Sequence, residues 1–262
     1  MNTKHVCTFF IILLGLGILP SCFIDLDDDF CERGRGPSVI EEIFVPSFDG
    51  IDLRISARVI VRRGESQQVE VRGQQNIIDL LDRDVSQGIW EIRLFECTRN
   101  FDELEIYITV PELTYLRVSG SGSIFSESTF EGNATEIIIA GSGEIDFATL
   151  SNETTISLSG SGDVRLDVEG NKIDSDISGS GFISLQGDVN EQDVRISGSG
   201  DYRAFDLLSR EAEVRIQGSG SSRIFVSEFL RATVSGSGDI RYRGNPSVDI
   251  SITGSGKVIN DN

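Results

Sequence analysis

The tripeptide Gly-Ser-Gly recurs eight times from residue 120 onward in this 262-residue chain, and this repeat restricts the possible folds more than any other feature. Successive copies begin 18 to 21 residues apart. Regular self-similarity near 20 residues is typical of stacked repeats, in which each unit buries its apolar face only against its neighbours. The first glycines of the copies are Gly120, Gly141, Gly160, Gly179, Gly198, Gly218, Gly236 and Gly254.

Apolar and polar residues alternate on both sides of each copy. The residue two positions before the first glycine is aliphatic in every copy, and the residue four positions before it is apolar everywhere except at Ser175. A period of two is the mark of a strand with one buried face. The pattern therefore predicts an all-β chain, with a parallel β-solenoid of about eight Gly-Ser-Gly coils stacked about 4.8 Å apart.

The same alternation predicts where the glycines point. Carried through the fifth copy, it places Gly198 and Gly200 on the inward face and Ser199 on the outward face. Valine at either glycine should then overpack the interior, whereas valine at Ser199 should be tolerated. The alternative is a row of β-hairpins that turn at Ser-Gly. The unbroken alternation argues against it, because a two-residue hairpin reverses the chain.

The first half of the chain is rich in strands but lacks the repeat. Alternating patterns predict strands at 51–59, 68–72, 89–94 and 104–110, and residues 77–84 read as one short helical turn. Trp90 is expected to be a core residue of its strand. Because the end of a solenoid exposes its core, we expect this β-rich half to cap and extend the coils.

The first residues predict export. Lys4 and the apolar run 6–19 form a signal-peptide pattern that is short for a membrane span. The sequence Leu19-Pro20-Ser21-Cys22 resembles a bacterial lipobox, which predicts lipidation of Cys22; the alternative is an ordinary cleaved signal with a chance cysteine. The acidic tether that follows looks like the surface-export tethers of Bacteroidetes lipoproteins, so cell-surface display is slightly favoured over the periplasmic face of the outer membrane.

Cleavage before Cys22 would also remove His5, the only histidine. Without histidine, the mature chain has no Ser-His-Asp or Cys-His nucleophile and no His-ligated metal site. Cys31 and Cys97 remain as a pair, and an oxidising compartment favours a disulfide that fastens the tether to the folded domain. Two free thiols are the alternative.

The charge of the chain argues against nucleic acid as a partner. The formal net charge is −19, and Lys4, Lys172 and Lys257 are the only lysines. A nucleic-acid binder needs clustered basic residues to neutralise phosphates. The expected partners are therefore the membrane, through the lipid on Cys22, and a protein or glycan ligand that the sequence does not identify.

Several short motifs resemble one known family when they are taken in order. Residues 47–51 (SFDGI), 63–65 (RGE), 73–78 (GQQNII), 110–113 (VPEL) and 118–122 (VSGSG) follow the order seen in the head GIN domain family. Members of that family are described as candidate auto-transporter adhesins and are common as Bacteroidetes lipoproteins. The resemblance covers about residues 39–260 and implies a β-solenoid-like fold with a cell-surface role.

The acidic residues of the repeat form no recognisable chemical site. Asp163, Asp201 and Asp239 occupy alternate coils, too far apart to share a calcium ion. Glu144 and Asp163 could be neighbours, as a glycosidase requires, but an acidic chain produces such pairs by chance. A basic column is expected near the column of Asp residues and partly matches it. Both columns are expected to be solubilising ladders. The basic residues are Arg165, Arg203, Arg223 and Arg241.

These observations predict a non-catalytic lipoprotein with no cofactor, metal site or catalytic residue, acting as a surface adhesion or scaffolding module. The alternative is a lipoprotein that binds or cleaves polysaccharide. The expected organisation is a signal peptide at 1–21, a tether at 22–38, a β-rich half at 39–115 and the repeats at 116–262, with 39–262 forming one continuous domain.

Overall fold

The computed structural model describes residues 31–262. The predictions for the signal peptide, for Cys22 and for most of the tether concern residues outside this range. The fold is nearly all β, with 69% strand and 2% helix, and it contains a β-solenoid of about 8 turns. The predicted fold class is therefore confirmed.

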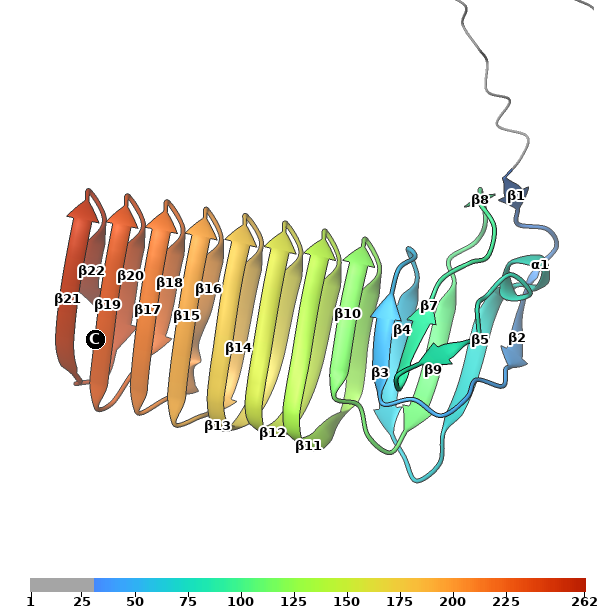
Figure 1. Cartoon of the computed structure of the whole chain (residues 1–262), viewed down its shortest axis with the longest axis horizontal. Coiled ribbons are helices and arrows are strands. Elements are labelled where there is room, and N and C mark those ends of the chain that lie inside the picture. The colour runs from blue at the N-terminus through green and yellow to red at the C-terminus, as the bar shows by residue number, and fades with distance from the viewer. Residues whose placement is uncertain (1–30) are drawn as a thin grey trace, which may run out of the picture. The chain divides into compact units, whose positions relative to one another are not determined.

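Each Gly-Ser-Gly coil contributes one strand to each of two parallel sheets (Figure 1). The strand before the motif belongs to the sheet nearer the viewer, here called the front sheet, and the strand after it belongs to the back sheet. β11 to β13 continue around the coil and serve both sheets. The strands are β10 (Tyr115–Gly120), β11 (Ser123–Gly141), β12 (Glu144–Gly160), β13 (Asp163–Gly179), β14 (Phe182–Asp188), β15 (Glu191–Gly198), β16 (Asp201–Leu208), β17 (Glu211–Gly218), β18 (Ser221–Phe225), β19 (Phe229–Gly236), β20 (Asp239–Arg243), β21 (Ser247–Gly254) and β22 (Lys257–Asn260).

The coils stack in the register that the repeat predicts. The first glycine of every motif pairs with the first glycine of the next, from Gly120↔Gly141 to Gly236↔Gly254. Equal positions therefore form continuous columns, and the aliphatic columns before and after the motif make the core. Parallel stacking satisfies the backbone hydrogen bonds of each coil with those of its two neighbours.

The orientation predicted for the first glycine of each motif is wrong. The second glycine is buried in all eight copies, but the first lies at the outer corner, exposed or half-buried, with φ between 120° and 140°. The chain reverses direction at this glycine, although the unbroken alternation predicts a strand that continues straight through the motif. The two arms nevertheless form no hairpin, because β15 pairs with β13 and β17 in neighbouring coils and faces β16 across the core.

Two further coils come from the first half of the chain. β3 (Gly50–Leu53) and β7 (Ile89–Ile92) extend the front sheet, and β4 (Arg58–Arg63) and β9 (Glu105–Val110) extend the back sheet, all in parallel. The single strand predicted at 51–59 is wrong, since residues 54–57 form the corner between β3 and β4.

Antiparallel strands cover the outer side of these coils. β5 (Gln68–Gln74) pairs with β9, β2 (Ser38–Glu42) pairs with β5, and β6 (Val85–Ser86) pairs with β7. β1 (Glu32–Arg33) and β8 (Thr98–Arg99) form a separate small sheet. The expectation that this half caps and extends the solenoid is confirmed.

The short helix begins earlier than predicted. α1 spans Gln75–Ile78 rather than residues 77–84. The difference arises because the following residues pair with the segment after β7: Leu81 bridges Leu94, and the Asp82 amide donates to the Arg93 carbonyl. That pairing leaves those backbone groups unavailable for a longer helix.

Large aromatic side chains fill the core at several levels, and Phe130 stacks on Phe147 at one of them, with ring centroids 5.3 Å apart. Trp90 is fully buried, as expected; its indole N–H donates to the Asp82 carbonyl at 2.9 Å, and its ring lies 5.5 Å from that of Phe48. Tyr202 is also fully buried, in the column that Ile183 occupies one coil earlier. It lies beside Ser175, the one polar exception in its column, so the small serine provides room for the ring.

Candidate functional surface

The outward positions of the back sheet carry the ladders that the sequence predicts. Glu144, Asp163, Phe182, Asp201, Ser221, Asp239 and Lys257 stack in one column. Two residues further along, Arg165, Ser184, Arg203, Arg223 and Arg241 form the basic column. Alternate placement keeps Asp163, Asp201 and Asp239 from stacking directly on one another. Like charges still stack elsewhere, since Glu144 lies next to Asp163 and three arginines of the basic column follow one another: Arg203, Arg223 and Arg241.

Phe182 occupies the gap between two of these aspartates. The guanidinium of Arg165 lies 5.1 Å from the centre of its ring, and that of Arg203 lies 4.6 Å from it, which are cation–π distances. Burial acts to raise the pKa of Asp201, but hydrogen bonds from Ser221 and Arg203 outweigh burial and lower it. The charged groups around Phe182 and Asp201 thus find their cation–π and hydrogen-bond partners within the two columns.

A second network of ion pairs runs along the front sheet. Arg195 bridges Asp176 and Asp193 at 3.6 and 2.7 Å, and Arg215 bonds the same Asp193 at 3.2 Å. The network continues through Arg231, which lies 3.4 Å from Asp249. Each arginine therefore links carboxylates of neighbouring coils, and isolated exposed pairs of this kind contribute little to stability.

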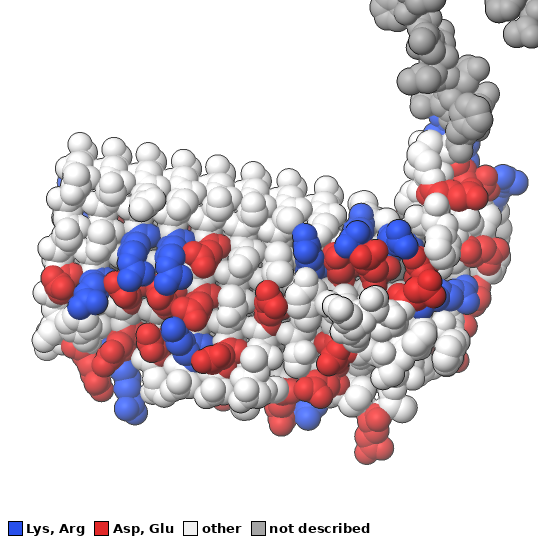
Figure 2. All heavy atoms as spheres, in the orientation of Figure 1, with Lys and Arg blue, Asp and Glu red and all other residues white. Residues whose placement is uncertain are grey.

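The edge formed by the Gly-Ser-Gly corners carries no charge. Figure 2 shows this edge as an uncharged band beside the ion pairs of the front sheet. The motif serines are all exposed, which confirms their predicted orientation, and from the second copy onward their backbone N–H groups donate to the preceding coil, as in Ser199 to Gly179 at 2.9 Å. The serines are Ser121, Ser142, Ser161, Ser180, Ser199, Ser219, Ser237 and Ser255.

The structure brings Glu144 and Asp163 together on adjacent coils. Arg165 binds Glu144 directly and lies 4.0 Å from Asp163. Burial raises the pKa of Asp163, with Arg165 opposing this shift and Glu144 adding to it. A glycosidase needs one carboxyl group kept protonated near neutral pH. Here the guanidinium of Arg165 lies beside both carboxylates and favours their charged forms. This is the arrangement of an ion-pair ladder.

A polar cleft in the first coils was missed by sequence reasoning. It encloses about 350 Å³, and Asp52 and Asp82 are buried in its wall. Arg54 lies 3.0 Å from Asp52, and Arg93 lies 2.8 Å from Asp82. These carboxylates come from segments far apart in sequence, so no local motif indicated them. The remaining lining residues are Asp84, Ser86, Gln87, Ile89, Glu91, Tyr115 and Arg117.

Within residues 31–262, no group of three or more His, Cys, Asp or Glu side chains is placed to hold a metal ion. In the same range, no helix has both the length and the apolar character needed to cross a membrane.

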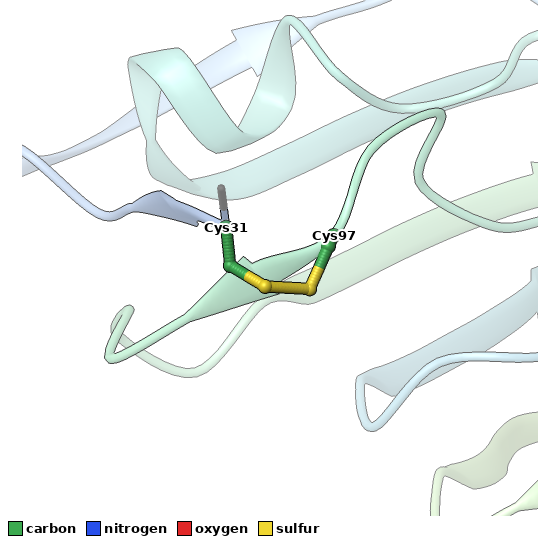
Figure 3. Close-up of a disulfide and its surroundings, with 2 residues drawn as sticks. All are labelled: Cys31 and Cys97. Atoms are coloured by element: carbon green, nitrogen blue, oxygen red, sulfur yellow. A yellow bond between two sulfur atoms is a disulfide. The ribbon is translucent and has the colours of Figure 1, made fainter. Parts of the chain in front are cut away.

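Cys31 and Cys97 form a disulfide, 66 residues apart in sequence (Figure 3). It joins the starts of β1 and β8, and the Glu32 amide next to it donates to the Cys97 carbonyl at 2.8 Å. The bond thus fastens the first described residues to the loop between β7 and β9.

Replacing Cys31 with serine should lower the free energy of unfolding by about 2–4 kcal/mol, because a long loop in the unfolded chain is no longer closed. Thermal unfolding with and without reductant measures the effect. Reductant should destabilise the wild type and leave the variant unchanged. Two alkylatable thiols at these positions in the non-reduced protein would contradict the bond.

The fold and its surface define a class: a repeat protein that presents long, regular polar faces. The sequence matches the family described as "Putative auto-transporter adhesin, head GIN domain" over residues 47–155 and 150–246, and the chain belongs to that family. The resemblance found in the motifs is therefore confirmed. No curated protein matches the sequence.

Solved structures from Parabacteroides share the fold. A "putative lipid binding protein" from P. distasonis is 27% identical with a TM-score of 0.81, covering 87% of this chain and 98% of its own. A "putative adhesin" from the same species is 25% identical with a TM-score of 0.82 and the same coverage. A "putative adhesin" from P. merdae is 22% identical, with a TM-score of 0.85 over 88% of this chain and 98% of its own, and supports the fold alone. The family and two of these neighbours are described as "putative" adhesins, and the third as a "putative lipid binding protein". None of these descriptions names an enzyme, and the adhesin descriptions suggest an exported surface protein.

Proposed function

We propose that the protein is a lipoprotein adhesin, anchored through Cys22 to the outer membrane and displayed on the cell surface. The observation that carries this proposal is where the chain enters the fold. Cys31 is fastened at the capped end, and the Gly-Ser-Gly coils continue away from that end (Figure 1). An anchor before Cys31 therefore leaves the regular faces free to meet another surface.

The chemistry of those faces suits broad, weak contacts. The ion-pair networks on both sheets present fixed charges of both signs along the stack. Many such contacts acting together produce avidity without a deep pocket. The alternative is binding of a neutral glycan, for which the cleft beside Tyr115 offers carboxylates, guanidinium groups and one aromatic ring.

Replacing Cys22 with serine should move the full chain from the membrane fraction to the soluble fraction and abolish attachment of intact cells, because the lipid site is lost. Fractionation and an adherence assay on neighbouring cells and matrix proteins measure the two effects, with Cys22→Ala as a second anchorless variant. Membrane retention of both variants would contradict the anchor.

The two parts of the proposal fail in different ways. If cells carrying the anchored wild type adhere no better than cells lacking the protein, the adhesive role is wrong even though the anchor stands. A glycan array probed with the purified chain decides the alternative: binding there, with no adherence to matrix or cells, would favour the polysaccharide-binding function.

A further inference from the structure

Within residues 31–262, no strand covers the core at the β21–β22 end of the solenoid. Within the described residues, β21 pairs only with β19, and β22 pairs only with β20. Ile250 and Ile252 are 48% and 43% exposed, whereas Ala232 and Val234 at the same positions one coil earlier are 0% and 1% exposed. This end therefore presents apolar side chains together with two free strand edges, a combination that favours strand pairing with another chain.

The two ends of the stack do not match each other. At the other end, β5 and β2 run antiparallel to the coils and α1 packs beside them. Head-to-tail stacking would require that end to present two parallel strands in the coil register. The end that does match β21 and β22 is the same end of a second copy.

Two copies that meet at these ends through a two-fold axis bring their strands together antiparallel. If the axis passes through Ser251, Ile250 lies opposite Ile252 of the second copy, and both residues belong to the inward face. Asp249 then lies opposite Thr253 of the second copy, so this pairing brings no like charges together.

The same axis gives a matching arrangement in the back sheet. Ser251 is three residues before Gly254, and Ile259 is three residues after Gly256, so the two lie opposite each other across the coil. Pairing β22 with itself about Ile259 places Lys257 opposite Asp261 of the second copy. Opposite charges that face each other across antiparallel strands stabilise the pair.

We propose that the β21–β22 end binds a second copy of this chain, tail to tail, so that both sheets continue antiparallel across the junction. In this dimer the exposed isoleucines of each copy complete the core of the other. The anchored ends then point in opposite directions, which suits contact between two surfaces that both display the protein.

A cysteine at Ser251 in the full chain tests the register. At the axis, the Ser251→Cys side chains of the two copies face each other with Cβ atoms about 4.5–5.5 Å apart, so a small local shift brings them to disulfide distance under mild oxidation. Thr233→Cys is the matched control, because it lies in the same column one coil earlier, about 14 Å from its own copy. We expect covalent dimer from Ser251→Cys at about tenfold the yield from Thr233→Cys, and none from the wild type.

Charges at the isoleucines test the apolar contact in the Ser251→Cys background. Ile250→Lys with Ile252→Lys places like charges opposite each other inside the completed core and should abolish the covalent dimer, whereas Ile250→Val with Ile252→Val keeps the contact apolar and should retain it. Both positions are half-exposed in one copy, so the variants should fold. Absence of dimer from Ser251→Cys, equal yields at both cysteine positions, or indifference to the Lys/Lys pair would each overturn the proposal.

Discussion

Replacing Gly200 with valine should lower the free energy of unfolding by about 3 kcal/mol, because the side chain has no space to occupy. A Cβ at this buried glycine would lie 2.4 Å from Cγ2 of Ile177 and 2.9 Å from the carbonyl oxygen of Gly181. Both atoms belong to the preceding coil, so the coils would have to separate locally. Urea or thermal unfolding of the full chain measures the loss.

Valine at Gly198 should be comparably damaging for a different reason. Its φ of 125° is a conformation that side chains rarely adopt, and a Cβ there would lie 2.7 Å from the Gly179 carbonyl oxygen. Ser199→Val is the matched control, since Ser199 is exposed between the two glycines, and it should cost about 0.5 kcal/mol or less. If Ser199→Val proved as damaging as Gly200→Val, the corner geometry would be wrong.

The corner illustrates what the repeat could and could not predict. Ile196, Gly200 and Tyr202 all point inward, and all three have even residue numbers. The inward residues on the two sides of the motif therefore fit one alternation with a period of two, whether or not the chain turns between them. The pattern therefore predicted the core columns and the stacking correctly, yet placed Gly198 on the wrong side. Only the positive φ of that glycine, which no pattern of apolar residues encodes, reverses the chain there.

The first half was harder to predict because its coils are not stacked in chain order. β10 packs on β3 rather than on β9, which immediately precedes it, so neighbours in sequence are not neighbours in the sheet. The alternation at 51–59 also continues through a corner that has no Gly-Ser-Gly signal. For the same reason, the buried carboxylates Asp52 and Asp82 could not be assigned to one cleft from sequence.

The surface ladders were predictable because the spacing of the repeat fixes which residues stack. The partners within them were not: Arg165 lies between Glu144 and the Phe182 ring, and that choice depends on rotamers. The exposure of Ile250 and Ile252 could also not be foreseen, since both fit the inward columns as well as any earlier residue. What distinguishes them is the lack of a following coil among the described residues.

A buried polar group at the fourth and fifth coils explains Ser175, the one polar residue in its apolar column. The Tyr202 hydroxyl donates to Oε1 of Gln192 at 3.0 Å, and Nε2 of Gln192 donates to the Ser209 hydroxyl at 2.8 Å. Burial raises the pKa of Tyr202, an effect that the neighbouring Ser175 hydroxyl partly offsets. The phenol therefore stays neutral, and its ring takes the space that isoleucine fills elsewhere in the column of Ser175.

Replacing Ser175 and Tyr202 with isoleucine, singly and together, should show that their effects on the free energy of unfolding are coupled. Tyr202→Ile should cost about 3 kcal/mol, from the cavity and from the lost donor to Gln192. Ser175→Ile alone should cost about 2 kcal/mol, because it overpacks the ring. The double variant should lose less than the sum of the singles by about 2 kcal/mol, since the isoleucine fills the cavity and only the unpaired Gln192 oxygen remains. Unfolding free energies of the four proteins give the coupling, and strict additivity would show that Ser175 and Tyr202 do not share that space.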